Sequence, residues 1–237
     1  MWGLRPRPGR GPRPSLTLDQ IVAAAVALAD AGGIEAVSMS KVAQALGTAP
    51  MSLYRYVDSK DELFMLMVDS VGTQAPTPAT GDEGWRVGLR RWAESYLDLL
   101  HSHTWIVRVP ISTPPITPRQ IAWLESGLQS LKGTGLTSFE KISTVTMLSS
   151  YVRAWAQLTD DISRAAAAVG STPEQAMEQY LRTLVSLIAD RFPEAYAAMS
   201  DPGMAAEDEG MDADFTFGLN RQLDGLESLI RSRESNA

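Results

Sequence analysis

The sequence predicts an all-α fold: a three-helix N-terminal domain that contains a helix-turn-helix, followed by a larger α-helical domain. Three observations support this prediction. Apolar residues recur at three- and four-residue spacing, the period of an amphipathic helix. Capping boxes open several of these segments, as in Thr17–Gln20 and Thr172–Gln175. No segment alternates apolar and polar residues in the way that a half-buried strand does.

Composition narrows the class of protein. Hydrophobic residues make up 44% of the 237 residues, which is enough to bury a full core. The chain has no cysteine, which excludes disulfides, thiolate metal sites and a cysteine nucleophile. We find no apolar run of about eighteen residues and no signal peptide, so we expect no membrane partner and a cytoplasmic location.

Charge is divided unevenly along the chain. The net charge is −7, yet residues 1–60 carry seven Lys or Arg against four Asp or Glu. The remaining residues carry fourteen against twenty-four. A basic head on an acidic body can still bind phosphates, because salt screens the repulsion beyond about 8–10 Å.

The first fifteen residues form a predicted flexible basic arm. It contains Arg5, Arg7, Arg10 and Arg13 and no acidic residue. Such an arm could lie along a DNA backbone or in a minor groove, or it could be a tail without a role. The sequence leaves both alternatives open.

Two short helices joined by a tight turn are predicted next. Ser38 can cap the first of them, and Gly47 suits a helix C-terminus that needs a positive φ. Thr48 is expected to cap the second helix, with Pro50 in its first turn. Leu53 and Val57 then face inward, which leaves hydroxyl, aromatic and arginine side chains on the outer face. This layout is typical of a helix-turn-helix that reads a DNA groove.

The residues of this region resemble the DNA-binding head of the tetracycline-repressor (TetR) family. The resemblance covers Val42-Ala-Gln-Ala-Leu-Gly, Leu53-Tyr-Arg-Tyr-Val and Lys60-Asp-Glu-Leu, and the preceding helix from Ile21 also fits. It implies base-edge contacts from Pro50, Met51, Ser52 and Arg55. It also implies phosphate contacts from Tyr54, Tyr56, Lys60 and either Ser40 or Lys41.

We expect three domains or segments: the arm at 1–15, the DNA-binding domain at 16–62 and an effector-binding and dimerisation domain at 63–237. A helix through Leu63–Val71 would connect head and body, and a loop follows at 72–84. Body helices are expected at about 85–103, 118–131, 138–169, 173–188 and 215–230. A short apolar segment spans 105–111, and residues 200–214 are read as an acidic loop.

The last predicted helix offers a surface for dimerisation. Gly218 and Gly225 are seven residues apart on one face and would let another backbone approach closely. The resemblance implies that this helix pairs across a two-fold axis with the helix at 138–169. The implied interface residues are Val152, Gly218, Leu219, Gln222, Gly225 and Leu226. The alternative is packing within one chain.

The family binds small molecules in the body, and the resemblance therefore implies an effector site here. The candidates are mainly aromatic and apolar: Tyr96, His101, Trp105, Val109, Ser112, Trp123, Met147, Tyr151 and Trp155. The alternative is that these side chains are ordinary core. Val109 and Leu158 stand where the tetracycline repressor has magnesium-binding groups, so we predict no metal and no cofactor.

The predicted function is a ligand-responsive transcriptional regulator, most readily a repressor. It would bind a palindromic DNA operator as a homodimer and be released by a small, largely apolar or aromatic effector. One alternative is an α-helical enzyme or carrier with a vestigial head. The sequence shows no paired carboxylates, serine–histidine arrangement or phosphate loop for an enzyme. Another alternative is a regulator whose body is filled solid and binds no effector.

Overall fold

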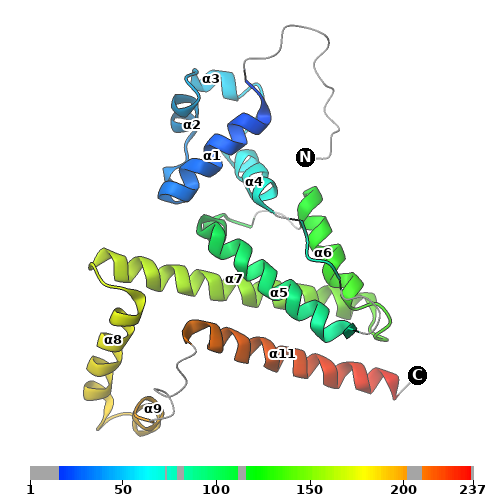
Figure 1. The fold of residues 1–237 in the computed structure, drawn as a ribbon, viewed down its shortest axis with the longest axis vertical. Coiled ribbons are helices and arrows are strands. Elements are labelled where there is room, and N and C mark those ends of the chain that lie inside the picture. The colour runs from blue at the N-terminus through cyan, green and yellow to red at the C-terminus, as the bar shows by residue number, and fades with distance from the viewer. Residues whose placement is uncertain (1–15, 73, 79–82, 112–115, 202–209, 236–237) are drawn as a thin grey trace. The chain divides into compact units, whose positions relative to one another are not determined.

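Every regular element that the computed structural model describes is a helix, which confirms the predicted all-α class (Figure 1). The structure describes residues 16–72, 74–78, 83–111, 116–201 and 210–235. The helices in chain order are α1 (Leu18–Gly32), η1 (Ile34–Ala36), α2 (Met39–Ala45), α3 (Pro50–Leu53), α4 (Lys60–Val71), α5 (Gly84–Ser102), η3 (Thr104–Arg108), α6 (Pro118–Ser130), α7 (Ser138–Ala168), α8 (Pro173–Ile188), α9 (Pro193–Met199) and α11 (Gly210–Glu234).

The chain forms two compact units. The first contains the described residues up to Ala156 together with those from Leu226 onward, and the second spans Gln157–Gly225. The helix-turn-helix head and the first part of the body therefore share one unit. The division at residue 62 was expected on functional grounds and stays a prediction.

The core of the head forms between α1 and α4, with α2 and α3 packed beside them. Ile21 and Ala25 of α1 and Leu63 and Met67 of α4 are fully buried. The predicted capping box starts α1: the Gln20 N–H donates to Thr17 Oγ1 at 3.2 Å, and the Thr17 N–H donates to Gln20 Oε1 at 2.9 Å. The cap satisfies backbone donors that a helix start leaves unpaired, so α1 begins where the sequence predicts.

Three local predictions need correction. Thr48 does not cap α3: its N–H donates to the Ala43 carbonyl at 3.0 Å, and Ala49 is the residue before the helix. Gly47 has a φ of 63° and reverses the chain directly after α2. The Thr48 backbone therefore pairs with the C-terminus of α2 and does not cap α3. The last helix begins at Gly210 rather than Phe215. The apolar periodicity that predicted it starts only at Phe215. The sequence reading also missed α9.

In the body of the first unit, α6 approaches α7 closely because Gly127 has no side chain. A Cβ built on Gly127 would lie 2.9 Å from Cγ2 of Val145 on α7 and 3.5 Å from Nε1 of Trp92 on α5. All three elements meet at this glycine. None of the described helices is both long enough and apolar enough to traverse a membrane.

The N-terminus of α7 is tied to the C-terminus of α11 by Glu140. Its carboxylate accepts from the Thr137 N–H at 2.8 Å and from the Thr137 hydroxyl at 2.9 Å, and Arg233 of α11 also donates to it. These hydrogen bonds, first to the Thr137 backbone and then to Arg233, lower the pKa of Glu140 from 4.5 to about 2.

The depressed pKa of Glu140 predicts an acid-dependent loss of stability. A carboxyl with a lowered folded-state pKa stabilises the fold fully above its unfolded pKa of 4.5, and this contribution disappears as the pH falls toward about 2. Glu140→Gln should therefore lower the melting temperature at pH 7, and its difference from the unmutated protein should shrink between pH 5 and pH 2. A difference that stays constant over this range, measured by circular dichroism, would contradict the assignment.

Candidate DNA-binding and effector sites

The helix-turn-helix consists of α2, the turn at Gly47 and α3. The N–H of Lys41 donates to Ser38 Oγ at 3.2 Å and starts α2. In α3 the hydrogen bonds continue past the helix end, because the Val57 N–H donates to the Leu53 carbonyl at 3.1 Å. Leu53 and Val57 are fully buried and anchor α3 to the head.

The opposite face of α3 is open to solvent. Met51 is 75% exposed and Tyr54 is 45% exposed, so both side chains are available to a partner. The residues predicted to contact DNA are either exposed (Ser40, Lys41, Pro50, Met51, Tyr54, Arg55 and Lys60) or half-buried (Ser52 and Tyr56). The face therefore combines hydrogen-bonding groups, positive charge and apolar surface, as base edges and phosphates require.

Lys60 lies at the start of α4. Ser59 caps this helix by accepting from the Glu62 N–H at 3.0 Å, while the Glu62 carboxylate accepts from the Asp58 N–H at 2.6 Å. The Lys60 ammonium lies 4.9 Å from the centroid of the Phe64 ring. An exposed lysine on the first turn of a helix is placed to bind a phosphate.

A cavity of about 570 Å³ lies in the body portion of the first unit. Its lining comes from α4, α5, η3, α6 and α7. Three aromatic rings form one group in it: Trp92, Tyr96 and Trp123 have centroids 5.5–5.7 Å apart and are tilted or edge-on to one another. The Trp92 indole N–H donates to the Trp123 carbonyl at 2.9 Å, which satisfies a buried donor and holds α5 against α6.

The cavity also has a few polar groups. Arg119 and Gln120 come from the start of α6, and Ser149 and Arg153 come from α7. The Arg153 Nη2 lies 3.4 Å from the Ile106 carbonyl and 3.5 Å from the Val107 carbonyl of η3. Apolar and aromatic walls with a small number of polar groups are typical of a small-molecule site.

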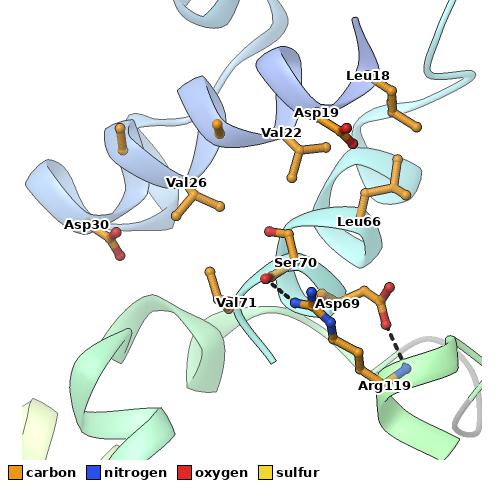
Figure 2. Close-up of a pocket in the computed structure, with 12 residues that line it drawn as sticks. Leu18, Asp19, Val22, Val26, Asp30, Leu66, Asp69, Ser70, Val71 and Arg119 are labelled. Carbon is orange, nitrogen blue, oxygen red and sulfur yellow. Dashed lines mark hydrogen bonds between the residues drawn. The ribbon is translucent and has the colours of Figure 1, made fainter. Parts of the chain in front are cut away.

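A second cavity, also about 570 Å³, lies between α1 and α4 (Figure 2). Its walls include aliphatic side chains such as Val22, Val26 and Leu66, and Asp19 and Asp30 also line it. It contains no aromatic side chain among its described lining residues. Arg119 contributes to both cavities.

Comparison with known protein families matches both parts of the chain. Residues 21–66 match the bacterial regulatory proteins of the tetR family, and residues 77–230 match the tetracyclin repressor-like C-terminal domain. The second match alone covers more than half of the chain. The protein belongs to the TetR family. It is accordingly a helix-turn-helix transcriptional regulator, as the sequence predicted.

Several proteins and solved structures similar to this chain come from Streptomyces. The transcriptional repressor DrrR1 of Streptomyces coeruleorubidus is 39% identical over all of this chain and 87% of its own length. The TetR family protein ActR of Streptomyces coelicolor, solved in complex with actinorhodin, has a TM-score of 0.74 and 26% identity over 91% of this chain and 98% of ActR. Its complex with (S)-DNPA has a TM-score of 0.70 and 27% identity over 89% of this chain and 97% of ActR.

The structure brings only some of the predicted effector residues together. Tyr96 and Trp123 line the aromatic cavity, and Val109 lines a separate space of about 70 Å³. Trp105 lies outside it: it is 1% exposed and its indole N–H donates to Asp30 of α1 at 2.7 Å. Ser112 lies outside the described residues. The remaining candidates are not among the lining residues of the cavity: His101, Met147, Tyr151 and Trp155.

The effector residues predicted from the sequence include neither Arg119 nor Arg153, although both line the aromatic cavity. The periodicity of α7 carries a usable signal, because Val145, Ser149 and Arg153 repeat every four residues and share one face. The sequence contains no comparable pattern that would identify Arg119. It follows the Thr117-Pro118 cap, and only the tertiary contact with α4 shows its position. No group of three or more His, Asp or Glu in the described part of the chain could hold a metal ion.

The predicted dimer residues fall into two groups. Val152 and Leu219 are fully buried, and Leu226 is 6% exposed, so these side chains have almost no surface left for a second chain. Periodicity identified them as an apolar stripe but could not tell which partner covers it. Gly225 is exposed, and a Cβ built on it meets no atom within 4 Å. Gly218 and Gln222 are half-buried. The interface of these six residues therefore stays a prediction; Gly218, Gln222 and Gly225 are the ones that keep exposed surface in the single chain.

The spacing of α6 and α7 across Gly127 predicts a coupled pair of substitutions. Gly127→Ala should destabilise the fold by about 1–3 kcal/mol, because its methyl group collides with Val145. Val145→Ala removes the colliding methyl groups, so the double variant should regain much of that loss. Urea unfolding of the four proteins gives the coupling free energy. Additive effects would contradict the close approach.

Proposed function

We propose that this chain is a ligand-responsive transcriptional repressor that binds a palindromic DNA operator as a homodimer. A small, largely aromatic molecule would release it from the operator. The observation that carries the proposal is that one compact unit contains both an exposed recognition face on α3 and an aromatic cavity, with α4 contributing to each region. A cytoplasmic location follows from this role.

On the operator, α3 would enter the major groove. Pro50, Met51, Ser52 and Arg55 would face base edges, and Lys60 with the neighbouring tyrosines would bind phosphates. Two such heads related by a two-fold axis would read half-sites about one to one and a half DNA turns apart. The basic N-terminal segment, residues 1–15, would add phosphate contacts; it lies outside the described residues.

The exposed positions on the dimerisation helices support a homodimer. Phe139 and Ile142 of α7 are 79% and 50% exposed, and Phe217 of α11 is 67% exposed. A second chain that packs along α7 and α11 would cover apolar side chains of this kind. The open space at Gly225 would let the backbone of a second chain approach α11.

For the effector, the cavity favours a flat aromatic compound. The tilted rings of Trp92, Tyr96 and Trp123 offer stacking and edge contacts to such a molecule. The related ActR, solved with actinorhodin, is consistent with a ligand in this body. A hundredfold loss of operator affinity needs about 2.8 kcal/mol of difference in effector binding between the two conformations, which a few such contacts can supply.

The alternatives from the sequence have less support. A cavity beside Trp123 argues against a body filled solid. An enzyme or carrier with a vestigial head would not need the exposed face of α3. Turnover of a bound compound by the purified protein would favour the enzyme.

The DNA-binding proposal predicts different effects for two substitutions. Arg55→Ala should cost about 1–3 kcal/mol on the operator and relax sequence preference, because a base contact is lost. Lys60→Ala should weaken binding to all DNA alike and reduce the salt slope by about one. Fluorescence anisotropy on intergenic DNA beside the gene, and on a scrambled duplex, measures both. The proposal fails if the unmutated protein shows no sequence-specific binding there.

The dimer proposal predicts that a large side chain at Gly225 disrupts association. Gly225→Leu should weaken the dimer at least about tenfold without unfolding the chain, since the single chain leaves this position open. Thr216→Leu is a matched control, because nine residues place it about 180° away on the same helix. Analytical ultracentrifugation gives the dissociation constants. Equal association of both variants would show that Gly225 lies outside the interface.

A further inference from the structure

We propose that Arg119 links the aromatic cavity to the DNA-binding head and selects effectors that carry an anionic oxygen. This inference rests on the proposed function and adds the chemical class of the effector and the residue through which it acts. It starts from the contacts of Arg119 with the end of α4.

Arg119 holds the C-terminal turn of α4. Its backbone N–H donates to Asp69 Oδ1 at 3.0 Å. Its Nη1 donates to the Asp69 carbonyl at 2.8 Å and also to the Ser70 carbonyl. Figure 2 shows Arg119 reaching from α6 to this turn. The last carbonyls of a helix have no partner inside the helix, so the guanidinium satisfies groups that α4 leaves open.

The helix that Arg119 holds belongs to the DNA-binding head. Leu63 and Met67 of α4 are fully buried in the head, where α4 packs against α1. Lys60, the predicted phosphate contact, is the first residue of the same helix. The position of one end of α4 relative to α6 therefore affects the end that faces DNA.

Arg119 also has donors to spare. Among the described residues only its backbone N–H and Nη1 make hydrogen bonds, which leaves Nε and Nη2 for another acceptor. Arg119 is one of the residues that line the aromatic cavity, and it also lines the cavity between α1 and α4. An oxygen atom of a bound molecule could therefore draw the guanidinium away from the carbonyls of α4.

A second guanidinium reinforces the positive character of the cavity. Arg153 lines the same space and lies near the carbonyls of η3 at 3.4–3.5 Å, which are weak hydrogen bonds. The charged side chains of the described lining are Arg119, Arg153 and Asp69, so positive charge exceeds negative by one. Such a site favours an aromatic acid or phenolate over a neutral or cationic compound.

The segment beside Arg153 also contacts the head. In η3 the Trp105 indole N–H donates to Asp30 Oδ1 of α1 at 2.7 Å, and His103 Nδ1 lies 2.8 Å from the same oxygen. Arg119 thus holds the end of α4, which belongs to the head. Arg153 holds η3, which is attached to the head through Asp30. A single anion between them would weaken both attachments.

The test uses the full-length protein and two probes that differ in charge, anthraquinone-2-carboxylate and anthraquinone-2-carboxamide. Quenching of tryptophan fluorescence gives probe affinity, and anisotropy gives operator affinity with and without probe. The unmutated protein should bind the carboxylate at least about tenfold more tightly than the carboxamide, as a charge-assisted hydrogen bond provides. The carboxylate should also lower operator affinity at least about tenfold.

Two ratios are compared: the affinity for the carboxylate over that for the carboxamide, and the operator affinity without the carboxylate over that with it. Arg119→Gln should reduce both ratios to about twofold or less, because the charge and the fork of donors are lost. Arg119→Lys keeps the charge without the fork, so it should keep part of the preference for the carboxylate but lose the effect on DNA. Arg91→Gln is the matched control: Arg91 also donates to a backbone carbonyl, that of Thr77 at 3.1 Å, but lines neither cavity. It should leave both ratios unchanged.

Several results would overturn the inference. These are equal affinity for the two probes, no binding of the carboxylate by the unmutated protein, or unchanged ratios in Arg119→Gln. A purely structural role for Arg119 would lower the melting temperature and weaken both probes equally, which also counts against it. Operator binding by the unmutated protein is measured first. If the unmutated protein does not bind an operator, the proposed function is overturned. If it binds but the Arg119 substitutions leave both ratios unchanged, only this inference is overturned.

Discussion

The packing of α4 against α1 is the contact on which the rest of the head depends. Fully buried side chains from both helices meet there, including Ile21, Leu63 and Met67. Burial of each such side chain contributes about 1.5–3 kcal/mol relative to exposure. Because α4 also contributes Val68 and Asp69 to the aromatic cavity, its two ends serve different sites. A rigid helix between two sites is the simplest element through which one can influence the other.

Electrostatics complement this arrangement. Positive charge is concentrated in the first sixty residues, whereas the rest of the chain is acidic. An acidic body repels DNA at close range and so keeps binding confined to the head. Within the cavity the balance is reversed locally, because two arginines face one carboxylate. The net charge of the chain reveals neither the basic head nor the positive cavity, since each depends on where the charges lie.

The rings of the aromatic cavity are fixed in orientation by contacts with one another and by a hydrogen bond. Trp92 and Trp123 are only 3% and 6% exposed, yet their edge-on contact and the indole hydrogen bond fix their orientation. Gly127 sets the separation of α6 and α7 just beyond them. The fixed rings oppose collapse of the space between the helices, because side chains in a protein interior otherwise pack closely.

The sequence by itself determined most of the helices, the turn at Gly47 and the outward face of α3, because caps, periodicity and turn chemistry act over a few residues. It did not give α9 or the start of α11. It also carried the family resemblance, which the comparisons confirmed. Tertiary structure decided which aromatic side chains surround a cavity: Trp105 turned to Asp30 of α1, and Arg119 came to α4 across fifty residues of chain. Periodicity shows that a side chain faces inward. It cannot show what that side chain meets there, because the partner comes from a distant segment.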